Sequence, residues 1–210
     1  MTWIEPVTLT GEHVRLEPAG DAHLDDLLDA AQDDELWAWM PWWRPRTREE
    51  MAAIVADAVP SGAVRLAQVE VATGRAVGFT NYMDISEQHR TLEVGGTWIG
   101  RPWWRTALNT EAKLLVLGHA FEHRGAHRVT LKTDIRNERS QAAIARLGAR
   151  REGVLRHHYV RKDGTLRDTV MFSVIAPEWP DVRSACGRGS RPARPERVAG
   201  RPPGGAARGG

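Results

Sequence analysis

The sequence predicts an α/β (α+β) fold, in which helices cover both faces of a mixed, mainly antiparallel central sheet of about seven strands. Alternating apolar runs separated by turn residues indicate antiparallel strands near both ends of the chain. Between them, residues 91–134 are arranged as strand, helix and strand, which predicts a parallel β–α–β crossover. The 210 residues, 41% hydrophobic and 27% charged, suit one sizeable core.

The predicted strands are short runs in which apolar residues alternate with polar residues or form a buried stretch. They cover residues 9–17, 63–71, 76–84, 91–99, 128–134, 150–160 and 166–175. Pro18 ends the first strand, and residues 72–75 and 162–165 have the composition of hairpin turns. Gly95 and Gly96 interrupt the fourth strand, which indicates a β-bulge there.

Four helices are predicted from apolar residues at helical spacing and from capping residues. They cover residues 22–31, 51–59, 110–124 and 137–147. Asp21 is the expected N-cap of the first helix, and Thr47 with Glu50 forms a capping box before the second. Gly125 and Gly148 end the last two helices.

The positive charge of the chain is concentrated at its C-terminal end. The net charge is +2, but residues 184–210 contain six arginines and one glutamate, so the preceding residues have a net charge of −3. Glycine and proline dominate this end, which cannot bury enough apolar surface to offset its ordering entropy. We therefore expect one domain over residues 1–183 and a disordered tail over residues 184–210.

Composition also excludes several classes of protein and site. The single cysteine, Cys186, cannot form an intrachain disulfide or a cysteine-cluster metal site. Histidine and acidic residues lack metal-ligand spacing, so we expect no catalytic metal. No apolar run is long enough to cross a bilayer and the N-terminus does not resemble a signal peptide, so we expect a cytoplasmic protein without a membrane partner.

Residues 93–149 carry the most informative motifs. They contain EVGGTWIG, RPWWRTALNTEAKLLVLGHAFEHRGA and HRVTLKTDIRNERSQAAIARLGA, an order that can place backbone N–H groups and a helix N-terminus around a bound anion. The stretch resembles the GNAT superfamily of acyl-CoA-dependent N-acyltransferases, in particular the Rim-type (RimJ/RimL-like) ribosomal-protein acetyltransferase branch. The resemblance spans residues 9–183.

The resemblance implies direct transfer of an acetyl group from acetyl-CoA to a primary amine of a small molecule or of a protein N-terminus. The alternative is a non-catalytic acyl-CoA-binding or regulatory module with the same fold. Specific nucleic-acid binding is not expected, because only the tail is basic. The C-terminal strands offer an edge for a homodimer.

The expected cofactor site departs from the family pattern Q/R-x-x-G-x-G/A. Trp104, Ala107 and Asn109 occupy its three defining positions, and alanine restricts the positive φ that glycine permits. The backbone bulge would polarise the thioester carbonyl. By resemblance, the cofactor-binding residues are Trp98, Ile99, Gly100, Arg105, Thr106, Ala107, Leu108, Asn109, Thr110, Asn137 and Ser140.

Proton transfer has several candidates. Ser140, in the family's N-x-x-S motif, is placed near the sulfur by the resemblance and would protonate the thiolate; alternatively, Asn137 and Ser140 simply begin a helix. Glu93 is the leading candidate for the base, and a solvated or salt-bridged glutamate is the alternative. His158 and Tyr159 are its rivals, and strand alternation places His157 and His158 on opposite faces.

The acceptor side is expected near four tryptophans that lie within seven residues. Trp37, Trp39, Trp42 and Trp43, with Arg44 and Arg46 beyond them, suit an apolar amine or a peptide N-terminus, and arginine is available for a carboxylate. Glu93 and His158 complete the expected acceptor site. The alternative is that Trp37 and one neighbour fill the core.

Overall fold

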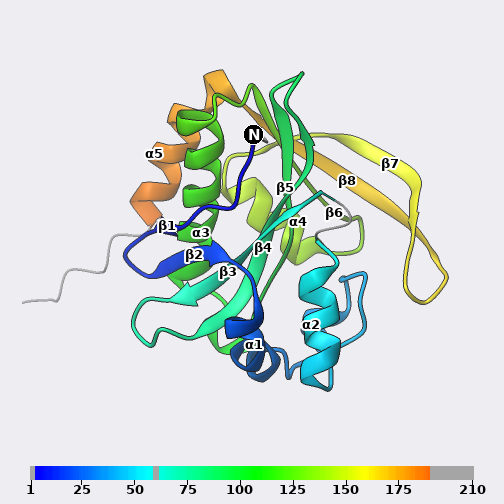
Figure 1. Ribbon diagram of the computed structural model, residues 1–210. Helices are drawn as coiled ribbons and strands as arrows, with labels where there is room; N and C mark the ends of the chain where they lie inside the picture. Colours follow the sequence, from blue (N-terminus) through cyan, green and yellow to red (C-terminus); the bar gives the residue numbers. More distant parts are fainter. Residues whose placement is uncertain (1–2, 59–61, 190–210) are drawn as a thin grey trace, which may run out of the picture.

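The computed structural model describes residues 3–58 and 62–189 and contains one eight-stranded sheet in the order β1-β2-β3-β4-β5-β6-β8-β7 (Figure 1). Its strands are β1 (Leu9–Thr10), β2 (Val14–Pro18), β3 (Val64–Glu70), β4 (Ala76–Ser86), β5 (Thr91–Ile99), β6 (Arg128–Asp134), β7 (Arg150–Val160) and β8 (Leu166–Ile175). Its α-helices are α1 (Leu24–Ala30), α2 (Arg48–Ala56), α3 (Ala107–Gly118), α4 (Glu138–Arg146) and α5 (Trp179–Gly189).

The sheet is antiparallel except for one pair, as predicted. β5 and β6 run parallel, and their pairing ends at Glu93 with Thr130 after only three residues. On its other side, β5 remains paired with β4 as far as Ile99. The two parallel strands therefore separate beyond Glu93, and the carboxylate lies at the fork.

The predicted strands agree closely with the structure except at the N-terminus. Residues 9–17 form a hairpin, β1 with β2, instead of one strand. The carboxylate of Glu111, in α3, accepts the backbone N–H groups of Glu12, His13 and Val14 at 2.8, 2.7 and 2.9 Å. A side chain at Gly11 would collide with this carboxylate, so glycine is required at the turn.

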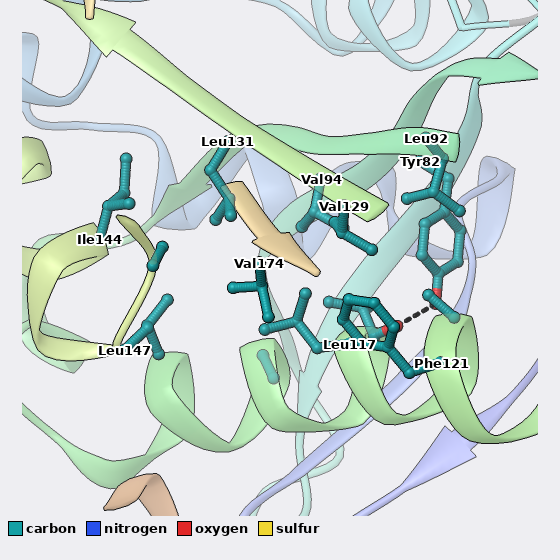
Figure 2. Close-up of a cluster of buried hydrophobic side chains, with 14 of the residues drawn as sticks. Tyr82, Leu92, Val94, Leu117, Phe121, Val129, Leu131, Ile144, Leu147 and Val174 are labelled. Carbon is teal, nitrogen blue, oxygen red and sulfur yellow. Dashed lines mark hydrogen bonds between the residues drawn. The ribbon is translucent and has the colours of Figure 1, made fainter. Parts of the chain in front are cut away.

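Helices cover both faces of the sheet, which confirms the prediction. On one face, α3, α4 and α5 bury a cluster that includes Leu117, Leu131, Ile144 and Val174 (Figure 2). On the other face, α1 and α2 bury a smaller cluster with β3, β4 and β5. In Figure 1, the β7–β8 hairpin extends away from the helices and the rest of the sheet.

Two predicted helix starts are wrong. The helix expected from Thr110 begins at Ala107 with Thr106 as its N-cap, because the Thr106 hydroxyl accepts the Leu108 N–H. Asp21 is not an N-cap; it begins a 3-10 turn, Asp21–His23, that leads into α1. Thr47 caps α2 as predicted, by accepting the Glu50 N–H at 3.2 Å.

The C-terminal boundary also differs from the expected one. Helix α5 continues through Gly189, whereas the tail was expected to begin at residue 184. The remainder of the expected tail, residues 190–210, lies outside the described residues. Among the described residues, no helix is long and apolar enough to cross a membrane.

Helix α3 ends in a π-helical turn, His119–His123, that is anchored to the sheet. The buried Tyr82 hydroxyl lies 2.9 Å from the Val116 carbonyl oxygen and 3.0 Å from Nδ1 of His119. Burial lowers the pKa of His119 to about 4, with smaller contributions from Arg124 and His123. The folded protein therefore holds His119 neutral.

We predict that this histidine makes the protein less stable at acidic pH. As the pH falls below about 6.5, His119 becomes protonated in the unfolded chain but stays neutral in the folded protein until about pH 4. The free energy of unfolding therefore decreases in this window. Between pH 7 and pH 5, the loss from His119 should be about 2 kcal/mol. Urea unfolding at both pH values should show a correspondingly smaller loss for His119→Gln. The exposed His89 provides the control: His89→Gln should retain the wild-type loss.

Candidate functional site

The centre of the candidate site is a bulge in β5, as the two glycines predicted. Phe79 pairs with Trp98, but Asn81 pairs with Gly95, so β5 contains one more residue than β4 in this interval. Gly96 has φ +56°, in the left-handed region that favours glycine. The Nδ2 of Asn81 donates to the carbonyl oxygens of Gly95 and Gly96 at 2.9 and 3.2 Å. A Cβ at Gly96 would lie 2.5 Å from this nitrogen.

A buried lysine supports the bulge from the other face of the sheet. Nζ of Lys113, in α3, donates to the hydroxyls of Thr97 and Thr80 at 2.6 and 3.2 Å. Burial lowers the pKa of Lys113 to about 7, partly opposed by Glu93. Our sequence analysis missed Lys113. Its position one helical turn after Asn109, and four residues before the buried Leu117, could have identified it as an inward-facing lysine.

A second lysine joins Glu93 to Tyr159. Nζ of Lys132, in β6, lies 2.7 Å from Glu93 Oε2 and 2.9 Å from the Tyr159 hydroxyl, and 3.4 Å from Asp84 Oδ2. Lys132 thus connects two of the residues predicted to transfer protons, Glu93 and Tyr159. The sequence signal was available, because alternation along β6 places Lys132 on the face opposite Val129 and Leu131.

Glu93 has the properties of a proton acceptor. It is 2% exposed, and burial raises its pKa to about 7 although Lys132 opposes the rise. Among the described residues its Oε1 has no hydrogen-bond partner, and a Cβ at Gly95 would lie only 2.6 Å from this atom. The free carboxylate oxygen therefore lies directly beside the bulge. Burial also acts to lower the pKa of Lys132, but Glu93 and Tyr159 together raise it, so this amine stays charged.

Strand β7 is irregular beside the two histidines. Between Leu155 and Tyr159 the register of β7 shifts relative to β8, and His157 has φ +50°. This irregularity brings two adjacent rings together, His158 and Tyr159, with centroids 4.0 Å apart. Burial and the nearby Lys132 lower the pKa of His158. Both rings therefore lie near Lys132, although they belong to consecutive residues of the strand, and the opposite orientation of His157 and His158 stays a prediction.

In the expected phosphate loop, the residue with positive φ is neither Ala107 nor Asn109. Ala107 and Asn109 lie in the first turn of α3, where no positive φ is needed. Arg105 instead has φ +63°. The first N–H groups of a helix lack intrahelical acceptors, and the Thr106 hydroxyl accepts the one from Leu108, so Thr106, Ala107 and Asn109 present free donors at the positive end of the helix dipole.

Trp104 fixes the start of this loop. Its indole N–H donates to the Ile99 carbonyl at 2.9 Å. The guanidinium groups of Arg101 and Arg139 lie 4.4 and 3.6 Å from its ring, and both arginines pair with Glu35. The loop is thereby linked to α4 and to the 3-10 turn Asp34–Trp37.

The backbone at the end of β5 already has internal partners. The Gly100 N–H donates to the Val77 carbonyl at 2.8 Å, and the Trp98 carbonyl accepts from Gln68 Nε2 at 3.3 Å. The Ile99 carbonyl also accepts the indole N–H of Trp104. Trp98, Ile99 and Gly100, which were expected to pair with pantetheine, therefore already use some of their backbone hydrogen-bonding groups within the protein.

Asn137 and Ser140 form a helix start, as the alternative interpretation predicted. Oδ1 of Asn137 accepts the Ser140 N–H at 3.1 Å and caps α4. This cap uses the oxygen of Asn137 and not its amide nitrogen. No recorded contact within the described part of the chain connects Ser140 with the Glu93–Lys132–Tyr159 group.

The four tryptophans divide between core and surface. Trp37 is 2% exposed and packs on Trp98, whose ring also contacts Phe79. Trp39 and Trp42 are half-buried, and Trp43 is 66% exposed. Nζ of Lys162, in the β7–β8 turn, donates to the Trp42 carbonyl at 3.0 Å and to that of Trp37.

The arginines beyond the tryptophans are already paired, and the described part of the chain shows no metal site. Arg44 and Arg46 lie 3.0 and 3.7 Å from Asp34 Oδ1, respectively. Within residues 3–58 and 62–189, no group of three or more histidine, cysteine or acidic residues is arranged to hold a metal ion.

Comparisons with known proteins agree with this architecture. A crystal structure of a GCN5-related N-acetyltransferase from Brucella melitensis superposes with a TM-score of 0.84 at 30% identity, covering 88% of this chain and 86% of that one. The ribosomal-protein-S5-alanine acetyltransferase from Vibrio fischeri shares the fold, with a TM-score of 0.68, 19% identity and coverage of 82% and 98%.

Curated relatives match over a shorter length. The uncharacterized N-acetyltransferase YoaA of Bacillus subtilis (strain 168) is 29% identical over 105 residues, half of this chain, which spans 58% of that protein. YdaF from the same strain, named as a candidate ribosomal N-acetyltransferase, is 29% identical over 107 residues, covering 50% of this chain and 57% of YdaF. The family model described as acetyltransferase (GNAT) domain matches residues 13–150. The chain therefore belongs to the GNAT acetyltransferase family.

Proposed function

We propose that this protein is an acyl-CoA-dependent N-acyltransferase that moves an acetyl group from acetyl-CoA to a primary amine by direct transfer. The observation that carries the proposal is Glu93: a buried carboxylate with a raised pKa and a free oxygen, located where β5 separates from β6 and beside the bulge. A carboxylate of this kind can remove a proton from an ammonium group near neutral pH.

The proposed reaction has three parts. Glu93 accepts a proton from the acceptor ammonium, directly or through water, and the neutral amine attacks the thioester carbonyl carbon. Backbone N–H groups of the bulge stabilise the developing oxyanion. The C–N bond forms, the C–S bond breaks, and a hydroxyl group protonates the leaving thiolate.

Tyr159 is the proposed proton donor to the thiolate, and Ser140 is the second candidate. The Lys132 ammonium donates to the Tyr159 oxygen at 2.9 Å, so the hydroxyl proton of Tyr159 is free to leave and the resulting phenolate would have a cationic partner. Ser140 has no such partner within the described residues.

The proposed cofactor site is the start of α3. Backbone donors of Thr106, Ala107 and Asn109 and the guanidinium of Arg105 would hold the pyrophosphate, with Leu108 and Thr110 beside it. Trp98, Ile99, Gly100 and Asn137 would contact the pantetheine arm. The acceptor would lie between the half-buried tryptophans, Trp39 and Trp42, on one side and Glu93, Lys132 and Tyr159 on the other.

A non-catalytic acyl-CoA-binding module remains the competing function, although the structure removes part of its basis. The lack of glycine at positions 107 and 109 has no backbone cost in a helix. The deciding experiment measures thiol release from acetyl-CoA across a panel of amines and peptide N-termini. Turnover supports the enzyme, whereas tight acetyl-CoA binding without turnover on any acceptor supports the module.

We predict that kcat/KM rises with pH and has a midpoint near pH 7, because the base must be ionised. Lys132→Met should move this midpoint to higher pH, since the ammonium stabilises the Glu93 carboxylate, and Lys132→Arg should restore it. Glu93→Gln should abolish this limb of the profile and lose activity most strongly at neutral pH. A wild-type profile in Glu93→Gln would remove Glu93 from the proposed role.

The two proton donors can be separated by their effect on turnover. Tyr159→Phe should lower kcat by about a hundredfold and leave the Kd for acetyl-CoA unchanged, because a proton donor acts in the transition state. Ser140→Ala should have a smaller effect on kcat. The reverse order of effects would assign the donor to Ser140.

Two substitutions at Arg105 separate charge from backbone strain. Arg105→Ala and Arg105→Gly both remove the guanidinium, so each should weaken CoA binding by about tenfold or less. Only glycine relieves the left-handed backbone, so Arg105→Gly should be about 1 kcal/mol more stable than Arg105→Ala in thermal unfolding. Unchanged CoA affinity in both variants would place the phosphates away from this side chain.

A further inference from the structure

A buried arginine connects helix α2 with β4. Arg65, in β3, is 8% exposed; its Nη1 donates to the carbonyls of Ile54 and Val55, the latter at 3.2 Å, near the end of α2. Its Nε donates to Asn81 Oδ1 at 2.7 Å. Burial lowers the pKa of Arg65 to about 10, so it is charged at neutral pH. No carboxylate among the described residues forms a salt bridge with it.

Arg65 also contacts the tryptophan segment. Its guanidinium carbon lies 5.1 Å from the Trp42 ring centroid and 4.4 Å from that of Phe79. Trp42 belongs to the proposed acceptor side, and its indole N–H donates to Asp57 Oδ2, directly after α2, at 3.3 Å. Arg65 therefore contacts both a residue that the proposed acceptor would touch and the end of the helix linked to it.

Asn81 transmits this position to the bulge. Its oxygen is fixed by Arg65, so its amide group must present Nδ2 to the carbonyls of Gly95 and Gly96. In a planar trans peptide the C=O and N–H point in opposite directions. Holding these two carbonyls toward Asn81 therefore aims the N–H groups of Gly96 and Thr97 away from β4, toward the side where β6 has separated from β5.

We propose that Arg65 and Asn81 are positioning residues that couple α2 and Trp42 to the direction of the bulge N–H groups. The inference rests on the proposed function, in which these N–H groups polarise the thioester carbonyl. Lys113 fixes the same bulge from the opposite face through Thr97, so the Asn81 side is the one connected to the acceptor elements.

The experiment compares Asn81→Ala, Arg65→Lys and the double variant in a thiol-release assay with the most active amine. Calorimetry measures the Kd for acetyl-CoA, and thermal unfolding measures stability. Asn81→Ala should lower kcat by about tenfold to hundredfold while the Kd changes by about twofold or less, because misaimed donors weaken mainly transition-state binding. Arg65→Lys should lower kcat less, and the double variant should match Asn81→Ala, because Arg65 acts through Asn81.

Two further variants separate positioning from folding. Asn81→Asp keeps the size of the side chain and the bond to Arg65 but removes both donors to the bulge, so it should fold and still show the loss of kcat. Arg75→Lys is the control: the half-exposed Arg75 binds the carboxylates of Asp26 and Asp29, near α1, and the kcat of this variant should stay at the wild-type value.

The outcomes are distinct. If the wild-type protein shows no turnover on any amine, both the proposed function and the positioning role of Arg65 and Asn81 are overturned. If the wild-type protein turns over and Asn81→Asp has the same kcat, only the positioning role of Arg65 and Asn81 is overturned. Additive losses of kcat in the double variant also overturn it, because two independent sites would then be responsible.

Discussion

One additional residue in β5 is the constraint on which the rest of the site depends. The extra residue prevents β5 from remaining a regular strand, and the parallel pairing with β6 ends close to the same point. Backbone groups that would otherwise be used within the sheet become available to a ligand, and Glu93 lies beside them. Glycine at positions 95 and 96 is needed because side chains there would collide with Glu93 and Asn81.

Three buried or half-buried basic side chains surround this bulge. The donors of Lys113, Lys132 and Arg65 are satisfied by hydroxyl, carbonyl and carboxylate oxygens, which limits the cost of removing charge from water. Glu93 is the buried acid among them, and their combined field favours negative charge near the bulge. This arrangement suits a reaction in which negative charge develops on a carbonyl oxygen.

The sequence predicted the strands, the crossover and the bulge, because alternation, glycines and turn residues are local signals. It did not predict the contacts that depend on register, such as Lys132 with Glu93 or Asn81 with the bulge. Two local features were not predicted. The irregularity after Leu155 brings the rings of His158 and Tyr159 together, and the Thr106 hydroxyl starts α3 one turn early, so the positive φ occurs at Arg105 and not at position 107 or 109.

The attachment of α3 has a consequence for ligand affinity. Glu111 ties the first half of this helix to the N-terminal hairpin, and Tyr82 ties its last turn to the sheet. A helix secured at two points does not have to be immobilised when an anion arrives at its N-terminus. The conformational entropy of this helix N-terminus is lost when the protein folds and not when the ligand binds, so more of the phosphate interaction remains as binding free energy.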